Sequence, residues 1–178
     1  MSKLKSSVSF VIPCLNEQDA LADVLAKINK VRETNFRELQ TEVIVSDNGS
    51  TDNSIKIAKE HGAKVVHCAQ RGCGAALLLA IKNAACETVV FADADNTYDF
   101  LETPRLVNEL EKGFDLVIGS RIEGDIHSGA MPFLHRYLGT PILNFLINLL
   151  YAKEGNKITD CNSGFRCFKR SNFPLLGR

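Results

Sequence analysis

Two carboxylates one residue apart are the first feature of the sequence that could do chemistry. Asp93 and Asp95 stand in the stretch FADADNTYDF, residues 91–100, where an apolar run passes into a polar one. Like charges this close repel each other, and a divalent cation would supply the opposing charge. In a loop, both carboxylates can converge on one Mg²⁺ or Mn²⁺ ion, which takes its remaining ligands from water and substrate phosphates. The alternative is a turn or helix cap that uses the two acids without a metal.

A second loop with an acid is the segment SDNGSTDNS, residues 46–54, which follows another apolar run. Asn48 and Gly49 are typical turn residues, and the Ser, Thr and Asp residues after them suit the cap of a following helix. Such a capping turn needs no ligand, but it also has no need of Asp47 at the end of the apolar run. A carboxylate in that place could accept hydrogen bonds from the N–H groups of a nucleobase.

The segment QRGCG, residues 70–74, forms a third loop ahead of a helical pattern. A dinucleotide fingerprint GxGxxG would need glycine at positions 72, 74 and 77, and Leu77 breaks that pattern. Arg71 and Gly72 would suit a phosphate group, because the N–H groups and the dipole of a helix N-terminus favour anions. The alternative is that the glycines only allow the helix to pack closely on a sheet.

Short apolar runs alternate with helical patterns through the first two-thirds of the chain. The runs are rich in β-branched residues and flanked by turn formers, which is typical of buried parallel strands. We predict strands at 8–13, 42–47, 64–68, 88–93 and 115–120, and helices at 17–32, 52–61, 75–84 and 104–112. Repeated strand–helix units favour an α/β fold, a mostly parallel sheet with helices on both faces. Ligands bind beyond the carboxyl ends of such strands, so the candidate site lies in PCLNE, SDNGSTD, QRGCG and ADADNTY.

The last third of the chain has a different pattern. Residues 131–151 are rich in Leu, Ile and Phe, but polar residues interrupt them well before the about 20 apolar residues that a membrane span requires. We expect two short amphipathic helices, broken near residues 139–141. In ITDCNSGFRCFKR, residues 158–170, a turn at 162–164 precedes an expected strand.

Composition narrows the class of protein. A chain of 178 residues, 45% hydrophobic and 24% charged, suits a single globular domain over residues 1–178. Lys plus Arg and Asp plus Glu both total 21, so no net charge indicates a nucleic-acid partner. The six cysteines contain no CxxC pair and are expected to be buried thiols in a reducing compartment. The N-terminus lacks a signal-peptide pattern, which predicts cytoplasmic synthesis without export.

Taken together, these loops resemble glycosyltransferase family 2, which has the GT-A fold. They resemble especially its polyprenyl-phosphate sugar transferases, the group that contains dolichyl-phosphate mannose synthase. The matching pieces follow one another in order between residues 8 and 170: VIPCLNEQDAL, VSDNGSTDNS, RGCGAALLLAI, FADADNTYD, DLVIGSR and DCNSGFRCFKR. The resemblance implies a hexosyltransferase that displaces UDP or GDP directly from the anomeric carbon, with inversion.

The resemblance also implies roles for residues that would bind this nucleotide-sugar donor. Asp93 and Asp95, with Ala94 between them, would hold a Mg²⁺ or Mn²⁺ ion that bridges the diphosphate. Asp47 would contact the base. The first loop would pack around the nucleoside through Pro13, Leu15, Asn16 and Glu17.

The resemblance also implies arginines that contact phosphate of the donor or the acceptor, because Arg offers planar bidentate donors to phosphate oxygens. They are Arg121 in GSR, Arg166 in GFR, and Arg136, with surface salt bridges as the alternative for Arg121 and Arg166. A lipid phosphate acceptor is already anionic and needs little help from a base. A hydroxyl acceptor would need one, and Asp160 would then be the general base, unless it only caps the turn at 162–164.

A polyprenyl-phosphate acceptor would give residues 131–151 a role. Such lipids lie in the bilayer, so amphipathic helices there would dock peripherally at the cytoplasmic face of a membrane. Helices that cover the core, or a dimer contact, are the alternatives, and no motif specifies an oligomeric state. The alternative functions are transfer to a saccharide or other hydroxyl, and a catalytically incomplete subunit that binds sugar nucleotides.

Two departures from the family pattern bear on these expectations. Thr97 stands where some members carry a Gln that serves as a further metal ligand, so the third protein ligand is open. The sequence also ends at PLLGR, soon after GFRCFKR, whereas many members continue into further helices. The resemblance therefore implies either a catalytic domain shortened at its C-terminus or a naturally short enzyme.

Overall fold

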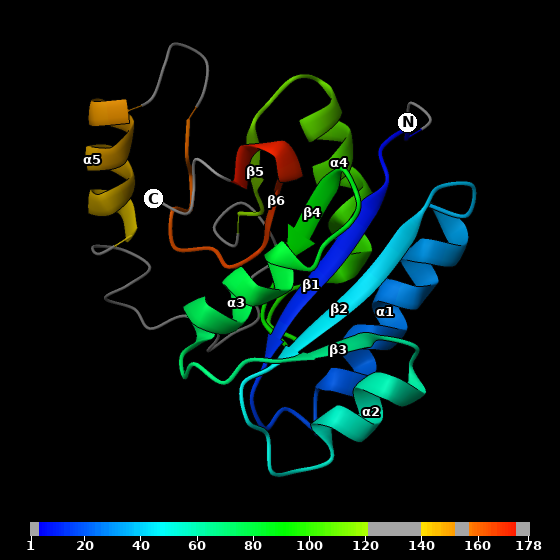
Figure 1. Ribbon diagram of the computed structural model, residues 1–178. Helices are drawn as coiled ribbons and strands as arrows, with labels where there is room; N and C mark the ends of the chain where they lie inside the picture. Colours follow the sequence, from blue (N-terminus) through cyan, green and yellow to red (C-terminus); the bar gives the residue numbers. More distant parts are fainter. Residues whose placement is uncertain (1–3, 121–139, 152–156, 174–178) are drawn as a thin grey trace. The chain divides into compact units, whose positions relative to one another are not determined.

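The computed structural model describes residues 4–120, 140–151 and 157–173 of the chain (Figure 1). The chain forms two compact units, one of residues 1–117 with 166–178 and the other of residues 118–165. The larger unit contains nearly all of the sheet, and the smaller unit contains helix α5 (Thr140–Tyr151) and the segment around Asp160.

The sheet has the strand order β3-β2-β1-β4-β6-β5 in the described part of the chain. Strand β1 pairs in parallel with β2 and β4, β2 pairs in parallel with β3, and β6 runs antiparallel to β4. The strands are β1 (Val8–Cys14), β2 (Thr41–Asp47), β3 (Lys64–His67), β4 (Thr88–Phe91), β5 (Leu116–Ile118) and β6 (Arg166–Lys169). The predicted α/β fold with a mostly parallel sheet is confirmed, as is the strand expected after residues 162–164.

Alternation of side chains along β1 divides the core between the two faces of the sheet. Phe10 packs with Phe36, just after the first helix, and with Phe100, at ring-centroid distances of 6.2 and 6.4 Å. Its neighbour Val11 belongs to a different buried cluster, which includes Ala80 of the third helix. Helices therefore cover both faces, as the sequence predicts.

The helices are α1 (Leu21–Thr34), α2 (Ser54–Glu60), α3 (Cys73–Lys82) and α4 (Thr103–Glu111), with short 3-10 turns η1 (Phe100–Glu102) and η3 (Arg170–Asn172). Helix α1 begins four residues later than predicted, because Glu17 O accepts the N–H groups of Ala20 (3.1 Å) and Leu21 (2.9 Å) and closes a turn first. Helix α5 begins at the predicted break, and residues 131–139 lie outside the described residues. None of the described helices combines the length and apolar character needed to cross a membrane.

The parallel register brings the carboxyl ends of the strands to one edge of the sheet. Cys14 pairs with Asp47, and Asp47 pairs with His67. Strand β4 ends at Phe91, two residues earlier than predicted, so Asp93 already belongs to the following loop. The four candidate loops therefore start from the same edge.

The opposite edge is held together by a partly buried polar contact at Glu42. Its Oε1 accepts hydrogen bonds from Ser9 Oγ and from the N–H of Ala85, both at 2.6 Å, and Ser9 Oγ in turn accepts the N–H of Cys86 at 3.2 Å. Burial alone would raise the pKa of Glu42, but these hydrogen bonds hold it below its ordinary value. The ionised carboxylate thus joins β1, β2 and the turn before β4.

We expect Glu42→Gln to lower the free energy of unfolding by about 1 kcal/mol at pH 7, because it removes a charge-assisted acceptor. A carboxyl whose folded pKa is lowered stabilises the fold above its unfolded pKa, and that contribution is lost as pH falls through the folded pKa. The difference from the wild type should therefore shrink between pH 7 and pH 3.5 in urea unfolding. Glu60→Gln, on an exposed position of α2, is the control. A deficit that stays constant with pH would contradict this role for the ionised group.

Candidate active site

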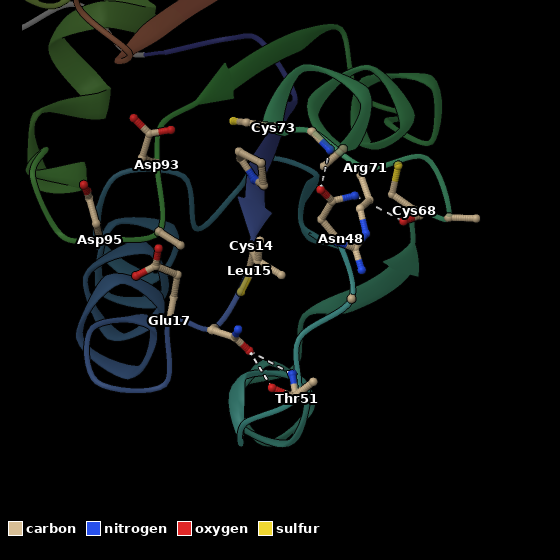
Figure 2. Close-up of a pocket in the computed structure, with 17 residues that line it drawn as sticks. Cys14, Leu15, Glu17, Asn48, Thr51, Cys68, Arg71, Cys73, Asp93 and Asp95 are labelled. Atoms are coloured by element: carbon tan, nitrogen blue, oxygen red, sulfur yellow. Dashed lines mark hydrogen bonds between the residues drawn. The ribbon is translucent and has the colours of Figure 1, made fainter.

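A cavity of about 720 Å³ lies at the carboxyl edge of the sheet, entirely within the larger unit (Figure 2). It is lined by the loops after β1, β2, β3 and β4, the four that the sequence singles out. Its lining residues are Pro13, Cys14, Leu15, Asn16, Glu17, Asn48, Gly49, Thr51, Cys68, Ala69, Arg71, Gly72, Cys73, Ala76, Asp93, Ala94 and Asp95.

The loop after β1 is tied to the loop after β2 by hydrogen bonds in both directions. Asn16 adopts a left-handed conformation with φ of 56°, which Asn tolerates better than most residues. Its Oδ1 accepts the N–H of Thr51 at 2.8 Å, while its own N–H donates to Ser50 Oγ at 3.0 Å. The N–H of Glu17 donates to Ser54 Oγ at 2.9 Å. The two loops therefore form one wall of the cavity before any ligand binds.

Asn48 ties the loop after β2 to the loop after β3. Its Nδ2 donates to the carbonyls of Gln70 (2.7 Å) and Cys68 (3.2 Å), and its Oδ1 accepts the N–H of Gly72 at 2.7 Å. Its backbone N–H donates to Cys14 O at 2.9 Å, at the end of β1. Asn48 thus joins its own loop to the end of β1 and to the loop after β3, as Figure 2 shows in part.

Asp47 is buried, with 3% of its surface exposed, and does not line the cavity. Its carboxylate accepts the N–H groups of Ser50 (3.0 Å) and Gly49 (3.2 Å), and His67 Nδ1 lies 3.3 Å away. Burial would raise the pKa of Asp47, but the hydrogen bonds from Ser50, His67 and Gly49 lower it below its ordinary value. The expectation that the turn has no need of Asp47 is wrong, and contact with a base stays a prediction.

Asp93 and Asp95 lie on one side of the cavity, near Glu17 (Figure 2). Asp93 is partly buried, and burial together with the charge of Asp95 raises its pKa. The pKa of Glu17 is also raised, by burial and by the charges of Asp95, Asp52 and Asp93. Like charges gathered in this way are the environment that a divalent cation relieves.

The loop that carries Asp95 is fixed by contacts on its far side. Asp95 Oδ1 accepts the N–H of Thr97 at 2.9 Å, and the intervening Asn96 is left-handed, with φ of 62°. Lys27 of α1 donates from Nζ to Asn96 Oδ1 at 3.0 Å and lies 3.7 Å from Asp99 Oδ1. Thr97 does not line the cavity, so its observed part is to orient Asp95 through its backbone N–H.

The donor set fits a divalent cation that also binds substrate. No group of three His, Cys, Asp or Glu side chains able to hold a metal occurs among residues 4–120, 140–151 and 157–173. Asp93 and Asp95 could therefore supply one or two ligands. Mg²⁺ and Mn²⁺ sites of this kind take their other ligands from water and phosphate oxygens.

Arg71 lies on the opposite side of the cavity from the two acids, in the loop before α3 (Figure 2). It is exposed and precedes Gly72, whose φ of 119° is a conformation that glycine adopts readily. The N–H of Gly72 is already bound to Asn48, so a phosphate here would rely on Arg71 and on later N–H groups of the helix. The acids and Arg71 together offer opposite charges to the two ends of a metal–diphosphate group.

Several lining residues were not among the predicted site residues. Asn48, Gly49 and Thr51 belong to a loop that the strand-end rule had already selected, so their place in that loop is a signal for them. Cys14 and Cys73 also lie in selected loops, PCLNE and QRGCG, whereas Cys68 lines the cavity from the end of a predicted strand, where no signal in the sequence marks it. Cys73 is exposed, which corrects the expectation that all six cysteines are buried.

Of the arginines expected to contact phosphate and the expected general base, the structure describes Arg166 and Asp160. Arg166 opens β6 and pairs with Phe91, the last residue of β4, so it lies beside the strand that leads to Asp93. Asp160 belongs to the smaller unit, is 1% exposed, and accepts the N–H of Ser163 through its backbone oxygen at 3.2 Å. Arg121 and Arg136 lie outside the described residues.

Comparison with known proteins places the chain that carries this site in a family. Residues 9–174 match the model of glycosyl transferase family 2. The low-salt glycan biosynthesis hexosyltransferase Agl6 of Haloferax volcanii is 37% identical over 176 residues, 98% of this chain and 41% of that protein. A dolichyl-phosphate hexose transferase of the same organism is 29% identical over 163 residues, 92% of this chain and 66% of that protein. The chain thus spans about half the length of the curated relatives it matches.

Solved structures give the same result for the fold. Glucosyl-3-phosphoglycerate synthase from Mycobacterium tuberculosis, crystallised with Mn²⁺, UDP and glucosyl-3-phosphoglycerate, superposes with a TM-score of 0.70 at 27% sequence identity. The match covers 93% of this chain and 57% of that protein. The chain belongs to glycosyltransferase family 2 and has the GT-A fold of that family.

Proposed function

We propose that this chain is the nucleotide-sugar-binding and catalytic domain of an inverting glycosyltransferase that transfers a hexose to a polyprenyl phosphate. The observation that carries the proposal is the cavity with Asp93 and Asp95 on one side and Arg71 on the other, in a domain of family 2. The Mn²⁺ and UDP in the mycobacterial structure support a metal-bridged donor. The relative named as a dolichyl-phosphate hexose transferase supports a lipid acceptor.

The cavity wall would hold the nucleoside of the donor. Leu15 is 50% exposed although it lies in the cavity, and it offers an apolar surface to a base or ribose. Pro13 and Asn16 flank it, and Asn16 is fixed by its bonds to the next loop. Because these loops are ordered by their own hydrogen bonds, binding would cost little conformational entropy in the wall.

The charged side chains would stabilise the negative charge that develops on the leaving diphosphate. Asp93 and Asp95 would hold the Mg²⁺ or Mn²⁺ ion, which when bound supplies Lewis-acid stabilisation of the departing diphosphate. Arg71, on the other side of the cavity, would contact the diphosphate as a fixed positive charge. Arg166, beside the end of β4, would contact phosphate of the donor or the acceptor through its planar guanidinium.

Asp160 would act on the acceptor. A polyprenyl phosphate brings an oxygen that is already anionic at neutral pH, so the proton demand on Asp160 is small. With a hydroxyl acceptor, Asp160 would be the general base, a role that typically contributes about 10²- to 10⁴-fold in rate. The size of the defect in Asp160→Asn therefore distinguishes the two acceptor classes.

Helix α5 offers a surface for the lipid. Its exposed apolar residues are Ile142, Leu143, Phe145, Leu146, Leu149 and Leu150. They recur at helical spacing, and Asn144 and Asn148 occupy the other face. A helix with one apolar face and no charged residue can lie in the interface of a bilayer and present the lipid acceptor there.

The donor model predicts metal-dependent nucleotide binding. We expect calorimetry to show UDP or GDP binding that requires Mn²⁺ or Mg²⁺, and Asp93→Asn and Asp95→Asn should each weaken it at least ten-fold by removing a carboxylate ligand. Asp23→Asn, an exposed acid in the first turn of α1, should bind as the wild type does. Binding that needs no metal and survives both changes would contradict the metal-bridged diphosphate, and intact binding without any turnover would favour a non-catalytic subunit.

The acceptor model predicts that α5 is needed for transfer at a membrane. With vesicles of phosphatidylcholine, phosphatidylglycerol and dolichyl phosphate, labelled sugar should pass from the donor into butanol-extractable lipid. The double variant Phe145→Asp, Leu149→Asp should float less with the vesicles and transfer at least five-fold more slowly, because two charges on the apolar face oppose insertion.

The matched control places two aspartates on exposed apolar positions of the larger unit, Leu78→Asp and Phe114→Asp. It should float and transfer as the wild type does. Equal flotation of all three proteins would remove the membrane role of α5, and label found only in a water-soluble product would replace the lipid acceptor with a saccharide or other hydroxyl.

A further inference from the structure

Helix α5 contacts the segment that carries Asp160 through two asparagine side chains. Asn144 donates from Nδ2 to the carbonyl of Thr159, and its Oδ1 accepts the N–H of Cys161 at 2.9 Å. Asn148 donates from Nδ2 to the carbonyl of Ile158 at 2.8 Å, and its Oδ1 accepts the N–H of the same residue, also at 2.8 Å. We call these four hydrogen bonds the asparagine clamp.

The clamp binds the backbone on both sides of Asp160. The two groups that bind Asn144 are the carbonyl of the residue before Asp160 and the N–H of the residue after it. Asn148, about one helical turn further along α5, binds both backbone groups of Ile158. The two asparagines therefore fix Ile158, Thr159 and Cys161 to one helix.

Burial shows that the clamp is more than a surface contact. Asn144 is 9% exposed and Asp160 is 1% exposed, whereas Phe145 and Leu149 on the other face of α5 are 65% and 67% exposed. Buried amides are tolerated where both their donor and acceptor are used, and here both are. An apolar side chain could cover the segment equally well, but it could not fix the backbone on both sides of Asp160.

We propose that Asn144 and Asn148 are positioning residues for Asp160, a role that rests on the proposed function, which places Asp160 at the acceptor. The clamp holds the backbone around Asp160 in one place, and its helix is the one that offers the apolar face to the lipid. Docking of the acceptor and placement of Asp160 are thereby governed by a single rigid element.

The first test removes one half of each clamp contact without changing its shape. In Asn144→Asp and Asn148→Asp, the new carboxylate still accepts the N–H of Cys161 or Ile158 but cannot donate to the facing carbonyl. The carboxylate repels the carbonyl that it faces and so opens the segment. We therefore expect hydrogen exchange of the Ile158 and Cys161 amides to accelerate at least ten-fold, with Mn²⁺-dependent UDP binding in the larger unit unchanged. Asn29→Asp, which alters an amide that donates to His61 O from α1, is the matched control and should leave exchange at 158 and 161 unchanged.

The second test asks whether the clamp acts through Asp160. With UDP-glucose, or GDP-mannose if GDP is the bound nucleotide, and dolichyl phosphate, we expect Asn144→Asp to lower kcat by the same small factor as Asp160→Asn, about three-fold, since this acceptor needs little help from a base. With a hydroxyl acceptor the shared factor would be about 10²-fold or more. The KM for the donor should stay within two-fold. In the Asp160→Asn background, Asn144→Asp should cause no further loss, because residues that act as a unit are not additive.

Three results would overturn the positioning role. They are an Asp160→Asn variant with wild-type kcat, effects that multiply in the double variant as for an independent structural defect, or unchanged amide exchange in the clamp variants. A failure of the proposed function has a different signature, in which the wild type binds nucleotide and metal but transfers no sugar to dolichyl phosphate. In that case amide exchange alone tests whether the asparagines hold the backbone around Asp160. Normal exchange in both variants would show that they do not.

Discussion

The alignment of strand ends in the parallel sheet is the constraint on which the cavity depends. Because Cys14, Asp47 and His67 share one register, three loops leave the sheet at the same level. Only then can Asn48 reach the backbone of its neighbours on both sides. A slip of one residue in β2 would turn its side chains to the opposite face and remove these bridges, so the core and the site are specified together.

The two sides of the cavity differ in their charge. The loops of the wall are held by their own hydrogen bonds, whereas the acids on the other side repel one another. The pKa values of Asp93 and Glu17 are raised first by burial and then by the neighbouring carboxylates. Hydrogen bonds from Thr97 and Lys27 hold Asp95 and its loop in place. A cation with a diphosphate would relieve the repulsion and therefore suits this place.

Much of this arrangement could be predicted from the sequence, because strand patterns and turn residues are local signals. The strands, the order of the loops and the pair Asp93 and Asp95 follow from such signals. The burial of Asp47 and the bridging by Asn48 do not, since they depend on which loop lies opposite in space, and the apolar spacing does not mark the early turn at Glu17. The asparagine clamp on α5 cannot be predicted from the sequence either, because its partners are backbone groups, which any residue types except proline would supply.

The division of labour within the cavity wall has an evolutionary consequence. Asn16 and Asn48 line the cavity and also shape its loops through hydrogen bonds, as Ser54 does, whereas Leu15 and Cys73 line it as exposed side chains. Substitutions at the exposed positions can alter the fit to a base or sugar without disturbing the scaffold that holds them. Such a domain can acquire a new donor preference in single steps, each of which passes through a folded protein.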